Sequence, residues 1–178
     1  MSVLGDRLLA VHGALTQSGL PHAFGGAIAL AYCTEEPRGT RDLDVNVFVD
    51  PRRASEVFDA LPPPVSRTAA ELSAAEREGQ VRLWWQDTPI DLFLDIHRFH
   101  RHVAGGVRLA PFEGHSIPVL GCTALAVFKA MFDRTRDWAD IEEMVQMDSL
   151  DISEAVWWLE SMIGAEAPVA RRMASLAR

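Results

Sequence analysis

Two aspartates separated by one residue begin the segment 42–49, whose sequence is DLDVNVFV. Successive side chains of an extended strand point to opposite faces, so Asp42, Asp44 and Asn46 share one face. The other face is apolar and consists of Leu43, Val45, Val47 and Val49. Because adjacent carboxylates repel each other, this polar face predicts either a compensating cation or free exposure to water.

A second segment, 90–96, alternates in the same way and places Asp91 and Asp95 on the face opposite its leucines and isoleucines. If the two strands are neighbours, three or four carboxylates converge on one surface. Carboxylate oxygens without a convergent Cys or His suit Mg²⁺ or Mn²⁺. Such ions can clamp the attacking and leaving oxygens of a phosphoryl displacement. Together the segments favour a metal site over a solvated face.

Two adjacent glycines, Gly25 and Gly26, follow the short apolar segment 22–24 and precede an apolar helical segment. Such a junction offers free backbone N–H groups to a phosphate, and no Cβ blocks its approach. Taken alone, two glycines before a helix are usually an ordinary turn. Combined with the aspartates, they indicate phosphate chemistry.

These residues require an α/β scaffold, because short strand patterns alternate with helical periodicity in the first part of the chain. Strands are expected at 22–24, 42–49, 80–86, 89–97 and 115–120, with 80–97 forming an antiparallel hairpin. Helices are expected at 3–17, 27–33, 51–61 and 66–78, and the chain from 123 onward is expected to be entirely helical. The sequence therefore predicts an α/β (α+β) core with a small mixed sheet at 1–120 and a C-terminal helical subdomain at 121–178.

Composition limits the function classes. A formal charge of −8 on 178 residues argues against a protein that coats nucleic acid through phosphates, although one specific RNA end can still dock. No run of 18 apolar residues occurs, so no membrane contact is expected and the protein is expected in the cytoplasm. Cys33 and Cys122 lie in apolar surroundings, where buried reduced thiols are favoured over a disulfide.

Two further segments have alternative explanations. The segment 97–102, HRFHRH, indicates either a transition-metal site or a flexible basic loop, and the loop is favoured because no spaced partner completes a metal site. The segment 136–144 offers Asp137 or Asp140 to an active site, but acids in the first turn of a helix explain them almost as well. The sequence does not decide whether Asp95 or Asp140 contributes to the site.

The order of these motifs resembles the nucleotidyltransferase superfamily with the polymerase-β-like fold. The downstream segment 125–144 resembles the AbiEii-like branch, which includes toxins of bacterial toxin–antitoxin systems. The resemblance spans about residues 20–145. The motif residues that carry it are Gly25, Gly26, Arg38, Thr40, Asp42 and Asp44, followed by Asp91 in the predicted hairpin.

The resemblance implies a metal-dependent enzyme that moves a nucleotide monophosphate from a nucleoside triphosphate such as ATP to an acceptor hydroxyl, releasing pyrophosphate. The acids Asp42, Asp44 and Asp91 would bind Mg²⁺ or Mn²⁺, and Asp91 would activate the acceptor. The family's lysine and following aspartate match Lys129 and Asp137, with Lys129 in a catalytic role. The nucleotide would be bound by Gly25, Gly26, Arg38, Thr40, Lys129 and Asp137.

The acceptor stays open between an RNA such as tRNA, a protein and a small molecule, and a toxin would imply an antitoxin partner. Two other readings compete: a non-catalytic nucleotide- or partner-binding relative, and an antibiotic-modifying enzyme. Many members of the superfamily have Gly-Ser where this chain has Gly25-Gly26, so a hydroxyl contact to the triphosphate is missing. The gap from these glycines to Asp42 is also longer, which weakens the analogy to antibiotic-modifying members.

Lys129 is also singled out by a count. Of the 17 Lys and Arg residues, it is the one lysine. A compact ammonium beside a triphosphate, where a planar guanidinium does not fit, explains it functionally, and chance is the alternative. Leu125, Phe128 and Phe132 recur at helical spacing and would pack inward. Lys129 is therefore expected near the edge of that face, with its stem reaching a cleft.

Overall fold

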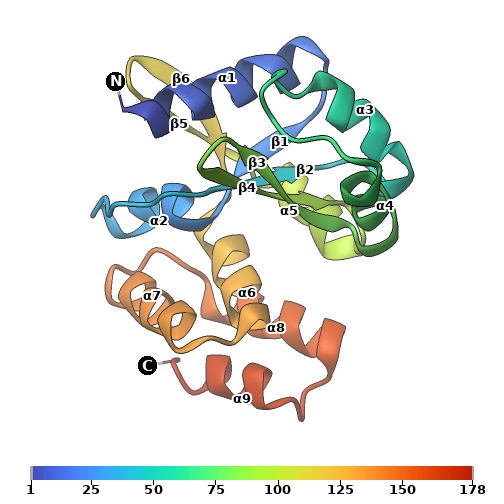
Figure 1. Cartoon of the computed structure of the whole chain (residues 1–178). Coiled ribbons are helices and arrows are strands. Elements are labelled where there is room, and N and C mark those ends of the chain that lie inside the picture. Colours follow the sequence, from blue (N-terminus) through green and yellow to red (C-terminus); the bar gives the residue numbers. More distant parts are fainter. Residues whose placement is uncertain (1, 178) are drawn as a thin grey trace.

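The computed structural model describes residues 2–177, and Figure 1 shows its arrangement. A mixed sheet of six strands has the order β3-β4-β2-β1-β6-β5. β2 pairs parallel with β4 and β1 pairs parallel with β6, whereas the other neighbours are antiparallel. The strands are β1 His22–Phe24, β2 Leu43–Val47, β3 Gln80–Trp85, β4 Thr88–Leu94, β5 Arg108–Phe112 and β6 His115–Val119.

Helices flank this sheet, which confirms the predicted fold class. In Figure 1 the helices that precede β3 lie with the sheet in the upper part, and the helices that follow β6 fill the lower part. The division into two domains at residue 120 stays a prediction. The helices are α1 Val3–Gln17, α2 Gly26–Thr34, the 3₁₀ turn η1 Pro51–Arg53, α3 Ala54–Ala60, α4 Ala69–Glu78, α5 Arg98–Gly105, α6 Cys122–Phe132, α7 Thr135–Gln146, α8 Ile152–Ile163 and α9 Pro168–Ala174.

Local sequence signals set several helix ends. The Ser2 side chain accepts a hydrogen bond from the Gly5 N–H (3.0 Å) at the start of α1. Thr68 and Glu71 form a capping box at the start of α4. Gly79 ends α4 in the left-handed conformation (φ +68°), where a Cβ would lie 1.8 Å from a methyl carbon of Ile96. This helix end leads directly into β3.

The alternation in the two acidic strands gives the expected core. Leu43 and Val45 on β2 and Ile90 and Leu92 on β4 are all fully buried. The two strands are parallel neighbours, and Asp44 is in register with Asp91. The expected convergence of the two acidic faces is therefore confirmed. The apolar face of β4 ends sooner than its pattern predicts, because the strand stops at Leu94 and Ile96 is 57% exposed.

Two elements differ from the sequence expectation. The segment expected as a flexible basic loop is helix α5, whose N-cap His97 accepts a hydrogen bond from the Phe99 N–H. Phe99 and Val103, four residues apart, are buried and hold this helix on the core. The segment between α5 and β6 contains β5, an edge strand that pairs with β6 and includes Pro111. An edge strand tolerates proline because one side of it makes no ladder hydrogen bonds.

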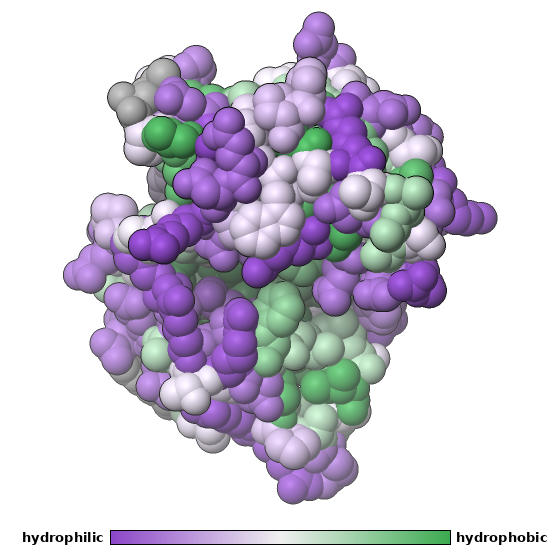
Figure 2. All heavy atoms as spheres, in the orientation of Figure 1, coloured by the Kyte–Doolittle hydropathy of each residue, from purple (hydrophilic) through white to green (hydrophobic). Residues whose placement is uncertain are grey.

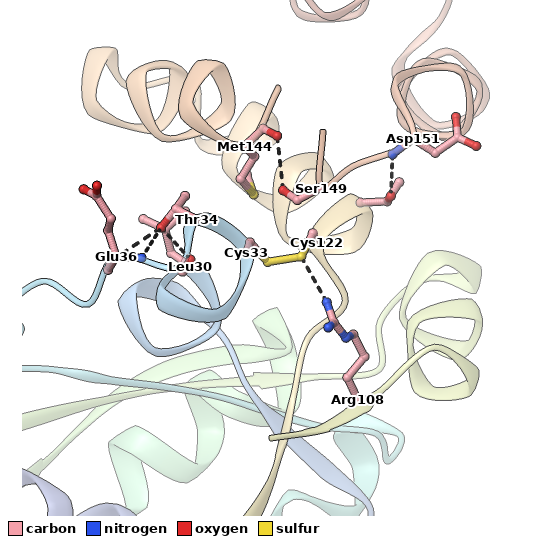
Figure 3. The surroundings of a disulfide bond; sticks show 10 residues. Leu30, Cys33, Thr34, Glu36, Arg108, Cys122, Met144, Ser149 and Asp151 are labelled. Atoms are coloured by element: carbon pink, nitrogen blue, oxygen red, sulfur yellow. Dashed lines mark hydrogen bonds between the residues drawn. A yellow bond between two sulfur atoms is a disulfide. The ribbon is translucent and has the colours of Figure 1, made fainter. Parts of the chain in front are cut away.

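The expectation of reduced thiols is wrong, because Cys33 and Cys122 form a disulfide. Their Cα atoms lie 5.6 Å apart, and both side chains are buried as expected. Figure 3 shows the bond between the last turn of α2 and the first residue of α6, with an Arg108 Nη1 atom 3.4 Å from the Cys122 sulfur. The pairing was missed because the cysteines are 89 residues apart and only tertiary packing brings them together.

None of the helices within residues 2–177 combines the length and the apolar character that crossing a membrane requires.

Candidate active site

A cavity of about 620 Å³ lies between the sheet and the helices that follow β6. Figure 2 shows this face hollowed between the upper and lower parts of the molecule. Every residue to which the resemblance assigns a role in the site lines this cavity, although these roles stay predictions. These residues are Gly25, Gly26, Arg38, Thr40, Asp42, Asp44, Asp91, Lys129 and Asp137.

Three carboxylates meet at the sheet side of the cavity. Asp42 directly precedes β2, Asp44 lies within it, and Asp91 is the register partner of Asp44 on β4. Burial raises the pKa of the Asp44 carboxyl to about 6, and the negative charges of Asp42 and Asp91 add to this rise. A carboxyl held in this way favours a proton or a cation as its partner.

The fit of a divalent cation is partial in the described conformation. Within residues 2–177 no group of three or more His, Cys, Asp or Glu side chains is arranged to hold a metal ion. The Arg82 guanidinium donates to both Asp91 oxygens (2.7 and 2.6 Å), and the Thr40 hydroxyl donates to Asp42. The donor chemistry and the raised pKa of Asp44 nevertheless fit Mg²⁺ or Mn²⁺. Because Arg82 is half exposed, it can leave Asp91 without disturbing the core.

Gly25 and Gly26 bring the start of α2 against these acids. The Gly25 N–H donates to the Asp44 carbonyl (2.8 Å). Gly26 has φ +50°, and a Cβ there would lie 1.8 Å from Asp44 Oδ2. A side chain at this position would therefore collide with the Asp44 carboxylate. Both glycines line the cavity, as does Ala27 in the first turn of the helix.

Basic side chains gather on the opposite side of the cavity. Lys129 on α6 donates to Asp140 Oδ2 (2.6 Å), and Arg38 Nη2 donates to the same oxygen (2.8 Å). Burial raises the pKa of Asp140, but the hydrogen bonds from Arg38 and Lys129 outweigh it and leave that pKa below its ordinary value. Lys129 reaches the cavity as expected, yet its side chain is buried and not at an edge.

Asp137 fits both explanations that the sequence offers, a residue of the active site and an acid in the first turn of a helix. It is buried, lines the cavity and lies 3.7 Å from the Lys129 ammonium. It also caps the start of α7, because Oδ2 accepts from the Arg134 backbone N–H (3.3 Å) and from Nε of the same residue (2.6 Å). Of the two acids left open, Asp140 lines the cavity and Asp95 does not.

Sequence reasoning missed three basic residues of the cavity: Arg82, Arg134 and Arg136. The signal for Arg82 was available, because the predicted β3–β4 hairpin pairs it with Asp91 once its turn is fixed. Arg134 and Arg136 follow no pattern of their own, and the packing of α7 against α6 brings them to the cavity. The complete site has Asp42, Asp44 and Asp91 with Arg82 on the sheet side, and Lys129, Arg134 and Arg136 with Asp137 and Asp140 on the helical side.

Comparison with known proteins supports the fold. No family model and no curated protein matches the chain. The crystal structure of ANT(2″)-Ia in complex with adenylyl-2″-tobramycin aligns with a TM-score of 0.63 at 12% identity, over 98% of each chain. The solution structure of the antibiotic-resistance factor ANT(2″)-Ia aligns with a TM-score of 0.61 at 13% identity, over 97% of this chain and 94% of that one.

A third structure, an antigenic nucleotidyltransferase-like protein from Paracoccidioides brasiliensis, aligns with a TM-score of 0.53 at 13% identity over 96% of this chain and 94% of that chain. The chain therefore has the nucleotidyltransferase fold. The AbiEii-like branch stays a prediction. At such low identity the activity does not follow from the fold and must be argued from the site.

Proposed function

We propose that this protein is a nucleotidyltransferase that moves a nucleotide monophosphate from a nucleoside triphosphate to an acceptor hydroxyl. The observation that supports this most directly is the charge arrangement of the 620 Å³ cavity. Carboxylates on β2 and β4 face basic side chains on α6 and α7, with the start of a helix between them. This arrangement suits a triphosphate with a divalent cation, and the volume is ordinary for a small-molecule site.

The donor triphosphate would lie between the α2 N-terminus and the basic side chains. Backbone N–H groups at a helix start favour phosphate, and Gly26 and Ala27 at this helix start line the cavity. Arg38, Lys129 and Arg134 form ion pairs with two carboxylates, Asp137 and Asp140, so these five groups together carry one net positive charge. That surplus charge attracts phosphate oxygens.

The acids would hold a divalent cation and handle the acceptor's proton. Asp42, Asp44 and Asp91 would bind Mg²⁺ or Mn²⁺, which neutralises charge on the phosphate oxygens and orients them. Asp91 would then accept the proton of the acceptor hydroxyl. The acceptor oxygen forms a bond to the α-phosphorus, the bond from that phosphorus to the bridging oxygen breaks, and pyrophosphate leaves.

A small molecule is the acceptor class with support beyond sequence resemblance. The ANT(2″)-Ia structure contains adenylyl-2″-tobramycin, which is a nucleotide joined to a small molecule. The RNA and protein acceptors, and the antitoxin partner, rest on the sequence resemblance alone.

The test is transfer of radioactive label from each α-³²P nucleoside triphosphate, with Mg²⁺ or Mn²⁺, to a small-molecule extract, RNA or protein. Asp91→Ala should lower turnover at least about 100-fold, as expected when a positioned base is lost. Asp95→Ala is the matched control, because Asp95 lies just beyond the same strand but outside the cavity. Failure of the wild type to bind any triphosphate by calorimetry would refute the proposal, and a reversed ranking of the two variants would show that Asp91 is not the third acid.

A further inference from the structure

A second cavity of about 350 Å³ adjoins the first one. The two share Gln80, Phe93, Phe128 and Phe132 in their walls. Phe93 lies two residues after Asp91 and on the same face of β4. A molecule whose hydroxyl lies at Asp91 can therefore extend directly along β4 into the second cavity.

The walls of the second cavity are aromatic and aliphatic. The ring centroids of Phe93 and Phe132, which line both cavities, lie 6.2 Å apart. The ring centroids of Phe99 and Phe128 lie 5.1 Å apart. Among residues 2–177, no Asp or Glu side chain lines this cavity. The charge of Asp95 acts on His100 from outside the lining, so ammonium groups placed against the aromatic walls would have no anionic partner in direct contact. The walls therefore disfavour a polycation such as an aminoglycoside.

Large apolar side chains remain exposed around this cavity. Within residues 2–177 nine large hydrophobic side chains are exposed, and four of them line it: Ile96, Met131, Phe132 and Ile163. Figure 2 shows hydrophobic side chains gathered beside the hollow, over the region of α6 and α8. Exposed apolar surface of this kind, next to a polar site, is typical of a ligand-binding groove.

One buried polar side chain in this cavity has no hydrogen-bond partner in the part of the chain that the structure describes. His100 on α5 is 8% exposed, and neither of its ring nitrogens makes a hydrogen bond. Its ring lies 5.1 Å from that of Phe128. Burial lowers the pKa of His100, so the neutral imidazole offers one N–H donor and one nitrogen acceptor to a ligand.

We infer that the 350 Å³ cavity binds the apolar, ring-bearing end of a small hydroxylated acceptor, which makes a hydrogen bond to His100. The hydroxyl of the same molecule lies at Asp91 and attacks the donor phosphate in the step given above. This inference rests on the proposed function and adds the chemical class of the acceptor: uncharged, aromatic or alicyclic, and small enough for the volume of a small-molecule pocket.

The test uses two uncharged probes, 2-naphthylmethanol and the same alcohol with a ring carboxamide, and tobramycin as the polycationic comparison. Binding is measured by calorimetry to the full chain with Mg²⁺ and a non-hydrolysable triphosphate present. His100→Phe keeps the ring contact with Phe128 but removes the hydrogen bond. This variant should weaken binding of the carboxamide probe at least tenfold and change binding of the plain alcohol little.

A second variant, Ile163→Trp, fills the cavity from its rim, at a side chain that is 39% exposed, and should weaken both probes at least tenfold. His115→Ala is the control, because His115 is exposed and lies outside both cavities. Triphosphate affinity should be unchanged in all three variants.

The two proposals fail in different ways. If the wild type binds triphosphate but neither naphthyl probe, or if Ile163→Trp binds both probes normally, or if tobramycin binds more tightly, the acceptor inference is wrong and the proposed function stands. If the probes bind as expected but no triphosphate binds, the proposed function is wrong and the acceptor role falls with it.

Discussion

At the scale of single residues, Asp44 is a site carboxyl whose pKa the fold raises. Its pKa of about 6 lies above the ordinary 3.8, because burial and two neighbouring carboxylates disfavour its charge. The folded protein therefore holds this proton more tightly than the unfolded chain does. The stabilisation from this proton is complete below pH 4 and is lost as the pH rises through 6, at a cost of up to about 3 kcal/mol.

Asp44→Asn should remove this pH-dependent loss of stability. The variant and the wild type should be equally stable near pH 4, and the variant should be more stable at pH 7.5 when metal is absent. Urea denaturation across this range gives the difference, with Asp59→Asn, at an exposed position, as the control. Saturating Mg²⁺ with triphosphate should stabilise the wild type and not Asp44→Asn. Equal stabilisation of both proteins would contradict the assignment of Asp44 to the cation.

Arg82 governs access to the third acid. Its guanidinium holds both oxygens of Asp91, yet its side chain is 52% exposed, so the pair contributes at most about 1 kcal/mol. Arg82→Ala should change the unfolding free energy little and strengthen Mg²⁺ binding up to about tenfold, because a positive charge leaves the acids. Titration of Mg²⁺ by thermal shift measures this, with Arg53→Ala as the control. Weaker Mg²⁺ binding in Arg82→Ala would show that Arg82 organises the acids.

Alternation of single residues was enough to predict the acids, since burial on one face forces Asp44 and Asp91 onto the other. It was not enough to predict their partners. Asp140 and Arg38 meet across 102 positions of sequence, and Arg82 faces Asp91 only because of the hairpin register. Ion pairs of this kind depend on tertiary packing, which produces no periodic pattern in the sequence.

At the scale of elements, α6 positions the lysine that the count singles out. Lys129 shares Asp140 with Arg38 in a buried setting, where a wider guanidinium would have to displace one of its neighbours. Lys129→Arg should keep the fold and weaken triphosphate binding roughly tenfold or more, which is about 1.4 kcal/mol. Calorimetric titration measures this. The exposed swap Arg171→Lys is the control, and wild-type affinity in Lys129→Arg would rule out a phosphate contact.

Elements with a distinct apolar face could be predicted from the sequence, whereas elements that contact the core through few residues could not. The leucines and isoleucines of β4 define its buried side without help from the rest of the chain. Helix α5 buries only Phe99, His100 and Val103, and basic residues surround them in the sequence. The sequence of this segment therefore indicates a loop. Strand β5 buries only Ala110 and contains a proline, so its pairing with β6 is what defines it.

At the scale of the whole molecule, the disulfide joins the two sides of the proposed active site. Cys33 lies on α2, which begins at the site glycine Gly26, and Cys122 begins α6, which bears Lys129 (Figure 3). The bond therefore fixes the helix start that would receive phosphate relative to the base that would bind it.

Loss of this bond should lower the unfolding free energy by about 4–5 kcal/mol, because closing so long a loop removes much entropy from the unfolded chain. The cysteines are 89 residues apart, and both are buried against packed helices, so the fold itself should survive. Guanidinium denaturation with and without dithiothreitol measures the wild-type change. The double variant Cys33→Ala/Cys122→Ala should match the reduced protein and ignore the reductant. A wild type that is indifferent to reductant would mean that the thiols are not joined, as the sequence alone suggests.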